Sequence, residues 1–469
     1  MFDLVAYRVK YTPHPHAGNG WCIYPSYDFT HGICDSLEHI DYSICTLEFE
    51  ARREPYYWIL WALDLYRPKV YEMSRLNISY TVLSKRRLIK LVDAKYVRGW
   101  DDPRMPTVSG LRRRGLNPTI VNRFCQDVGA TRAQNLVDMA KLLQTARQVL
   151  APVCCRVMAV LQPIRIVLTN FGDVDASTHG PFTVANVATD DSKGSHTIAM
   201  TSNVIYIDAS DFRFQDSKEY YGLAPHKAVG LKYHGGNLVC DEVVYTNDKD
   251  KTIQELHCHI DLAEDRPKPK TYISWVPETS VPAEVRVYGN LFTVPEPTDL
   301  WEDELNAQSE IVYPKALIDP SVNEFLQGMV VDKWQSGIAL QFERLGYFVV
   351  DYDTTYDAAT QKGQLVFNRT VSLKEDVVKN QKSDKELAEL AARRERAQVA
   401  LLAKEKRMAI APADLFRLAD EYVGKYSQYN AEGIPTHDVD GKEVSKSMMK
   451  KLAKEQQKHI KQVKNWKPS

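Results

Sequence analysis

The chain reads Arg75-Leu76-Asn77-Ile78-Ser79-Tyr80-Thr81-Val82-Leu83-Ser84-Lys85-Arg86 shortly after a β-rich run. Serine and lysine donors on a short loop can stabilise negative charge as it develops on the phosphates of a nucleotide. A Ser-Lys-Arg tripeptide is also common in ordinary solvated turns, so this stretch alone leaves both interpretations open. The residues on either side of it decide between them.

Strand and helix patterns alternate around this stretch, from the start of the chain to about Gly115. Residues 21–24 and 70–73 have the composition of strands, and residues 46–65 between them place apolar side chains at helical spacing. This alternation predicts a parallel α/β sheet. Because there are too few strand–helix units for a complete doubly wound domain, we expect residue 1 to lie partway through one.

The rest of the chain changes in character twice. Residues 152–372 alternate short β-branched runs with Gly, Pro and Asp turns, which predicts all-β barrels or sandwiches, and the length suggests two of them. A capping box at 383–386 predicts a charged helix to about Met408, and a linker at 433–441 is expected before a strongly basic helix. Residues 118–150 are predicted to be helical from an apolar stripe of Phe124, Leu136, Met139, Leu142, Leu143 and Val149.

Composition excludes several classes of protein. The formal net charge is −1, so a nucleic-acid surface has to come from local clusters of Lys and Arg. The eight cysteines form no Cys-x-x-Cys pair, which indicates a reducing compartment. The sequence shows no secretory signal and no apolar run that could span a bilayer, so we expect a cytoplasmic protein without a membrane partner.

Five further blocks give the stretch at 75–86 its context. Together with it they follow the order and spacing of glutaminyl-tRNA synthetases, and the resemblance runs from about residue 4 to about residue 376. The stretch itself resembles the second ATP-site signature of class I aminoacyl-tRNA synthetases, and the Cys-Thr-Leu-Glu-Phe block favours glutamine over glutamate. The blocks are residues 21–31, 35–40, 45–49, 100–104 and 111–115.

The resemblance implies roles for residues of the catalytic half. Lys85 and Ser84 would be catalytic, with Lys85 contacting the departing pyrophosphate. Tyr27 and Cys45 would bind glutamine; the alternative for each is a packed core residue. Bacterial relatives carry Gln where this chain has Val70, which puts the detailed map of that pocket in doubt. The ATP site would consist of Thr46, Arg75, Leu76, Leu83, Ser84 and Lys85.

The anticodon side has its own motif. Residues 341–348 resemble the Gln-Phe-Glu-Arg block of the family, in which Gln341 and Arg344 would contact splayed anticodon bases. Arg156 matches an arginine that meets the anticodon loop, and surface ion pairs are the ordinary alternative for both arginines. Where bacterial relatives have consecutive basic residues, this chain has Tyr221 and Gly222, so stacking on tyrosine could replace part of the base reading.

Three other patterns leave two interpretations each. Arg112-Arg113-Arg114 could clamp the tRNA backbone or form a solvated face. His257-Cys258-His259 could suggest a metal site, but a second pair of ligands is missing and we expect no metal. The basic helix near the C-terminus could add non-specific tRNA affinity or be a plain charged helix.

The resemblance implies four regions. Residues 1–115 would be the C-terminal part of a Rossmann-type class I catalytic domain, 116–151 a helical connector, 152–376 two anticodon-binding barrels, and 377–469 a charged helical tail. The implied activity is ATP-dependent joining of glutamine to tRNA(Gln) through glutaminyl-adenylate, with Mg²⁺ accompanying ATP and no tightly bound cofactor. The tail is a candidate contact for other synthetases.

One half of the expected ATP site is missing. Class I synthetases use a His-x-Gly-His motif at a helix N-terminus, where amides and the helix dipole favour phosphate, and the 469 residues contain no such motif. We therefore expect an N-terminally truncated ligase that is inactive alone. The alternatives are a non-catalytic tRNA-binding module and a relative that charges glutamate.

Overall fold

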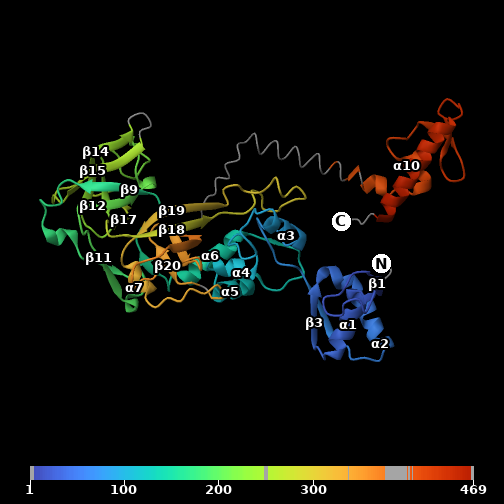
Figure 1. Cartoon of the computed structure of the whole chain (residues 1–469), viewed down its shortest axis with the longest axis horizontal. Coiled ribbons are helices and arrows are strands. Elements are labelled where there is room, and N and C mark those ends of the chain that lie inside the picture. Colours follow the sequence, from blue (N-terminus) through green and yellow to red (C-terminus); the bar gives the residue numbers. More distant parts are fainter. Residues whose placement is uncertain are drawn as a thin grey trace. The chain divides into compact units, whose positions relative to one another are not determined.

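A computed structural model describes residues 5–247, 252–335, 337–374, 399, 402–403 and 405–465 (Figure 1). The chain divides into two compact units, residues 1–378 and 379–469, each with its own core. Within the described residues, no helix is both long and apolar enough to cross a membrane.

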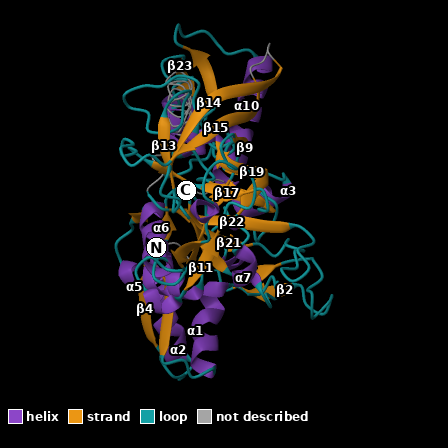
Figure 2. Ribbon diagram, turned by 90° about the vertical axis from the view of Figure 1, so that its left-hand side faces the viewer, coloured by secondary structure: helices purple, strands orange, loops and turns teal. Residues whose placement is uncertain are grey.

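Residues 5–73 form a small α/β layer. Strands β3 (Tyr42–Thr46) and β4 (Lys69–Met73) pair in parallel; β4 contains the strand predicted at 70–73, whereas β3 was not predicted. A parallel pair needs a crossover, which the 3-10 segment η1 (Leu47–Arg52) and helix α2 (Arg53–Ala62) provide. Helix α1 (Tyr27–Leu37) packs beside α2 (Figure 2). The N-terminal part of this segment is an antiparallel hairpin of β1 (Tyr7–Val9) and β2 (Ile23–Pro25), so the prediction that the strand at 21–24 belongs to a parallel sheet is wrong.

Four helices follow. The prediction that residues 118–150 are helical is confirmed for 118–128 and 139–150 and is wrong for the residues between them. A left-handed Gly129 (φ +70°) ends one helix, and Asp138 begins the next by accepting a hydrogen bond from the Ala140 N–H. Leu136, expected in the apolar stripe, lies instead in a short strand that pairs with residues 77–78. The elements are β5 (Asn77–Ile78), α3 (Lys85–Asp93), α4 (Val108–Arg113), α5 (Pro118–Val128), β6 (Leu136–Val137) and α6 (Met139–Leu150).

The predicted pair of β-barrels corresponds to two seven-stranded, nearly closed sheets. Each sheet begins and ends on the same stretch of chain: the edge strands are separated by Ser274 alone in the first and by Met158 alone in the second. The first sheet runs β16 (Tyr272–Ile273), β13 (Ala228–Leu231), β14 (Asn237–Asn247), β15 (Thr252–Asp261), β9 (Pro163–Leu168), β12 (Val204–Asp208), β17 (Trp275–Pro277). The second runs β7 (Cys155–Val157), β20 (Ala339–Phe342), β21 (Gly346–Val350), β22 (Leu365–Ser372), β18 (Val281–Tyr288), β19 (Glu310–Ile318), β8 (Ala159–Val160).

Each barrel encloses an apolar core. Trp275 is fully buried in the first, and Phe342, Phe348 and Phe367 are fully buried in the second, where their rings contact one another. Two short elements accompany the barrels: the β10 (Phe182–Ala185) and β11 (Ser195–Ile198) hairpin, and helix α7 (Val322–Leu326).

The second unit is not purely helical, so the prediction for this region is partly wrong. Residues 433–441, expected to be a linker, contain a strand of a small hairpin. Gly433 lies against the Ala413 carbonyl at φ +82°, where a Cβ atom would clash. The basic helix is confirmed as α10 (Lys446–Asn465), whereas the helix predicted from 383 lies mostly outside the described residues. The other elements are η5 (Pro412–Asp414), α9 (Leu415–Leu418), β23 (Tyr426–Tyr429) and β24 (Pro435–Asp438).

Candidate functional sites

Tyr27 and Cys45, the predicted glutamine-binding residues, line the same hollow in the α/β layer. Tyr27 begins α1 and its ring stacks on His31 at 4.8 Å between centroids, while Cys45 lies on β3. Burial raises the pKa of both groups, and the charge of Glu72 adds to the rise at Cys45. Both side chains are therefore neutral near pH 7, which suits an uncharged amide ligand.

Two residues that line this hollow, His31 and Tyr56, belong to a hydrogen-bonded cluster that the sequence did not indicate. The Asp35 carboxylate accepts hydrogen bonds from Ser43 (2.6 Å) and from the Tyr56 hydroxyl (3.1 Å). His31 lies 3.0 Å from the same carboxylate. Burial raises the pKa of Tyr56, so its hydroxyl stays a donor. The cluster fixes the ring on which Tyr27 stacks.

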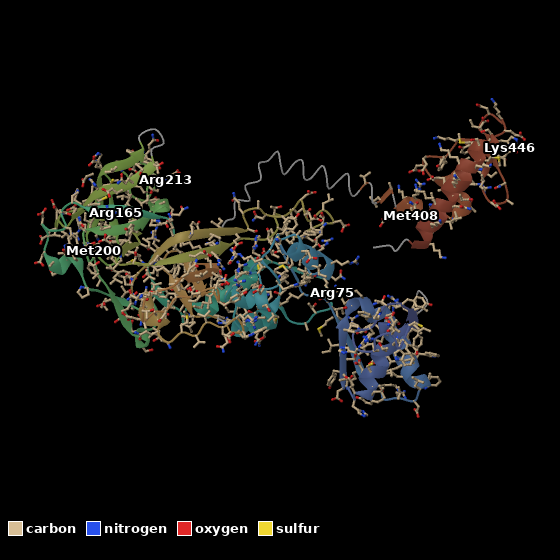
Figure 3. The ribbon with its side chains drawn as sticks, viewed as in Figure 1. Arg75, Arg165, Met200, Arg213, Met408 and Lys446 are labelled. Carbon is tan, nitrogen blue, oxygen red and sulfur yellow. The ribbon has the colours of Figure 1, made fainter. Side chains whose placement is uncertain are left out.

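Glu48 links two of the predicted ATP-binding residues. A hydrogen bond from Thr46 is the main cause that lowers the pKa of Glu48, and the nearby Arg75 lowers it further. The Arg75 guanidinium lies 2.6 Å from the Glu48 carboxylate. Arg75 stands in the segment between β4 and β5 (Figure 3), next to Leu76, whose side chain is 37% exposed. Thr46 and Arg75 thus belong to one surface.

Leu83, Ser84 and Lys85 form a second group, at the start of α3. Ser84 is the residue before the helix, and its hydroxyl makes no capping hydrogen bond. All three side chains are exposed. Among the described residues, no hydrogen bond or ion pair joins this group to Thr46 or Arg75. The structure therefore presents the predicted phosphate donors at a helix N-terminus, separate from the Glu48 surface.

Helix α3 is anchored on the long connection between β18 and β19. The Arg87 guanidinium pairs with Asp299 at 2.8 Å, and Lys90 contacts Glu302 and lies 5.8 Å from the centre of the Trp301 ring. A shared apolar core lies beneath these pairs. It comprises Val82, Leu91, Val97, Met105, Leu291, Phe292 and Trp301.

The three predicted anticodon residues, Arg156, Gln341 and Arg344, line one hollow. Strand β7 pairs in parallel with β20, which places Arg156 directly opposite Gln341. Arg344 follows in the turn to β21, in the left-handed region at φ +67°. Residues 185 positions apart in the sequence therefore meet at the junction of the two barrels.

Each arginine in this hollow is held by a partner. Arg156 donates to the Ala185 carbonyl at 2.9 and 3.2 Å. Arg344 donates from both terminal nitrogens to Asp211, at 2.6 and 2.7 Å. A guanidinium has five N–H donors, so this pairing fixes the orientation of Arg344 while other donors stay available.

Lys232 and Glu343 complete the hollow. The Lys232 ammonium and the Tyr233 hydroxyl both contact the buried Glu343 carboxylate. Burial, and then the positive charges of Arg156 and Arg344, lower the pKa of Lys232 to about 8, although Glu343 favours its charged form. In the sequence, only the basic side chain of Lys232 pointed to a role in tRNA binding. Glu343 stood out only as part of the Gln-Phe-Glu-Arg block.

Three family models match this chain. Residues 1–152 match the catalytic domain of "tRNA synthetases class I (E and Q)", and residues 154–261 and 272–351 match two anti-codon binding domains of the same family. The chain belongs to this family. All strands of the two barrels except β22 (Leu365–Ser372) lie within the anti-codon binding matches, and the stretch at 75–86 lies within the catalytic match.

Several curated relatives are similar over most of the chain. A "Glutamine--tRNA ligase" of Lupinus luteus is 44% identical over 390 residues, which cover 81% of this chain and 47% of the relative. The Arabidopsis thaliana "Glutamine--tRNA ligase, cytoplasmic" is 42% identical over 391 residues, with the same two shares. The Bos taurus "Glutamine--tRNA ligase" is 43% identical over 380 residues, covering 80% and 46%. This E/Q synthetase chain spans about half the length of the curated relatives it matches.

The structure corrects the interpretation of Arg112-Arg113-Arg114 in this E/Q synthetase chain. The Arg113 side chain is 7% exposed and pairs with Asp351 and Asp353 of the second barrel. Arg114 is also buried and donates to the Thr370 carbonyl. Neither a phosphate clamp nor a solvated face therefore describes these two residues, and the triplet is mainly structural.

The two histidines of the His257-Cys258-His259 run each pair with a carboxylate. His257 lies 3.0 Å from Glu255, His259 lies 2.8 Å from Asp241, and Cys258 is buried. In the part of the chain that the structure describes, no group of three or more His, Cys, Asp or Glu side chains could hold a metal ion.

Tyr221 is 55% exposed, so its ring is open to a stacking partner.

Proposed function

We propose that this chain is part of a glutamine–tRNA ligase, which joins glutamine to tRNA(Gln) at the expense of ATP through glutaminyl-adenylate. The observation that carries the proposal is the hollow in which Arg156, Gln341 and Arg344 converge with Lys232. An amide and guanidinium groups at one place can read the exposed edges of unpaired bases. The names of the relatives agree with this activity.

In the catalytic half, the chain's residues divide between two tasks. Tyr27 and Cys45 offer uncharged groups to the glutamine amide, while the cations of the same hollow, Arg52 and Arg53, already pair with Asp28 and Glu72. This arrangement disfavours glutamate, because its carboxylate would compete for cations that are already neutralised. Thr46, Arg75, Leu76 and Leu83 line the nucleotide. Ser84 and Lys85 stabilise the charge of the departing pyrophosphate, and Mg²⁺ accompanies ATP as part of the substrate. The reaction takes place in the cytoplasm.

A non-catalytic tRNA-binding module is the second candidate function. It is favoured by one observation, the absence of a His-x-Gly-His motif from the 469 residues. Both candidates give the barrels the same task. They differ in whether the phosphate donors at Ser84 and Lys85 are ever used. Contacts of residues 377–469 with other synthetases belong to the proposal as well.

We expect the 469-residue chain to show no glutamine-dependent exchange of pyrophosphate into ATP, even with tRNA(Gln) present. The reason is that half of the phosphate-binding donors of the class I site are missing. The Bos taurus relative named glutamine–tRNA ligase serves as the positive control. Robust exchange by the 469-residue chain would show that its own residues suffice, and a preference for glutamate in that assay would contradict the glutamine assignment.

A further inference from the structure

Arg112 is the member of the arginine triplet that the fold does not use internally. Arg113 pairs with Asp351 and Arg114 donates to the Thr370 carbonyl, both in the second barrel. Arg112, at the end of α4, makes no ion pair within the described residues. Its guanidinium instead lies 5.8 Å from the centre of the Trp334 ring. A cation left without a carboxylate beside an aromatic ring is available to an external anion.

Trp334 stands on the loop between α7 and β20. Its side chain is 67% exposed, although a ring of this size is usually covered in a folded protein. The Lys333 ammonium lies 4.9 Å from the centre of the same ring. We call Arg112, Lys333 and Trp334 the Trp334 patch. Arg112 and Lys333 also line one hollow together with Gln335.

The charge of the patch is positive. One acidic residue of the loop, Asp332, lines the same hollow. The Asp332 carboxylate accepts a hydrogen bond from the Trp334 backbone N–H at 2.9 Å, which closes the turn that presents the ring. Asp351, at the back of the hollow, is fully buried and is paired with Arg113. The two cations of the patch therefore outnumber the acids that face it.

We propose that the Trp334 patch is an RNA-binding surface, with a base stacked on Trp334 and backbone phosphates beside Arg112 and Lys333. An exposed ring flanked by cations suits single-stranded or splayed nucleotides, because every base has a π face and every linkage a phosphate. The inference rests on the proposed function, since the RNA is the tRNA whose anticodon loop is proposed to bind in the hollow lined by Arg156, Gln341 and Arg344.

The position of the patch agrees with one continuous ligand. Its loop runs directly into β20, and Trp334 precedes Gln341 by seven residues, a span of at most about 25 Å. An RNA held at the hollow can therefore reach the patch with nucleotides outside the anticodon itself. Tryptophan and arginine are also frequent in protein interfaces. Within the described residues, however, neither Arg112 nor Lys333 makes an ion pair, and this charge together with the short chain distance to Gln341 favours RNA.

The test measures the affinity of the full chain for a tRNA(Gln) transcript over a series of salt concentrations. We expect Trp334→Ala to weaken binding about tenfold, through loss of one stacked base. Trp58→Ala is the matched control, because Trp58 is similarly exposed (64%) on α2. We expect the double variant Arg112→Gln/Lys333→Gln to reduce the slope of log affinity against log salt by about 2. Lys95→Gln/Lys362→Gln, two exposed lysines elsewhere in the unit, should leave the slope unchanged.

The outcomes separate this inference from the proposed function. If Arg344→Ala weakens tRNA binding while both patch variants bind as tightly as wild type, the patch does not bind RNA. A protein-binding surface would then be the alternative. If the wild-type chain itself does not bind tRNA(Gln), both proposals fall. Unchanged thermal unfolding of the patch variants shows that any loss of affinity arises at the surface.

Discussion

Replacing Arg344 with alanine is expected to weaken the binding of tRNA(Gln) by about 10- to 100-fold. A guanidinium that reads a base edge contributes about 1–3 kcal/mol of discrimination. Arg344 is already oriented by Asp211, so little conformational entropy is lost when a base arrives. The measurement is a binding isotherm with a labelled transcript at fixed salt.

Arg165→Ala is the matched control for this change. Arg165, on β9, is as exposed as Arg344 (39% against 37%) and also pairs with one carboxylate, Glu255. We expect its loss to change affinity less than twofold. Arg344→Lys should recover only the electrostatic part of binding, because an ammonium lacks the planar fork. Equal effects of Arg344→Ala and Arg165→Ala would mean that Arg344 acts as an ordinary surface charge.

Replacing Arg113 with alanine is expected to destabilise the first unit by about 3–5 kcal/mol. Arg113 donates to Asp351 at 2.8 and 3.1 Å, and Asp351 has no exposed side-chain surface. Burial alone would raise the pKa of Asp351, but the hydrogen bonds and charge of Arg113 hold it below its ordinary value. The truncation therefore removes the closest cation of a buried carboxylate and leaves it with Arg286 at 3.5 Å and with hydrogen bonds from Asn368 and the Asp353 N–H. Urea unfolding followed by tryptophan fluorescence measures the loss.

Two further variants give this prediction its control. Arg123→Ala removes an exposed arginine of α5, and we expect less than about 0.5 kcal/mol. Asp351→Asn combined with Arg113→Ala should be less destabilised than the sum of the two single changes, because the two side chains interact directly. Additive effects, or an Arg113→Ala chain as stable as Arg123→Ala, would show that this ion pair does not hold α4 against the second barrel.

The motifs and the character of two regions were readable from the sequence for a local reason. Strand β4 and helix α2 follow from the pattern at residues 46–73, and the barrels follow from short runs between turns. The Gln-Phe-Glu-Arg block combines Gln341 and Arg344 in a single stretch. For such features, the chemistry and the geometry lie within a few residues of each other.

The partners of these residues were not readable, because they lie far away in the sequence. Asp211 precedes Arg344 by 133 positions, and Asp351 follows Arg113 by 238. The closure of each barrel at Ser274 and Met158 likewise depends on pairing between distant strands. The break at residues 129–138 was missed because apolar spacing continued across it, while the local conformation of Gly129 and the cap at Asp138 ended the helix.

The proposed function requires that the two barrels bind the anticodon loop of tRNA(Gln). The direct measurement compares the affinity of the wild-type chain for tRNA(Gln) with its affinity for a transcript in which the three anticodon bases alone are changed. We predict that the changed transcript binds at least about tenfold more weakly at the same salt concentration. Equal affinity for the two transcripts would contradict the claim.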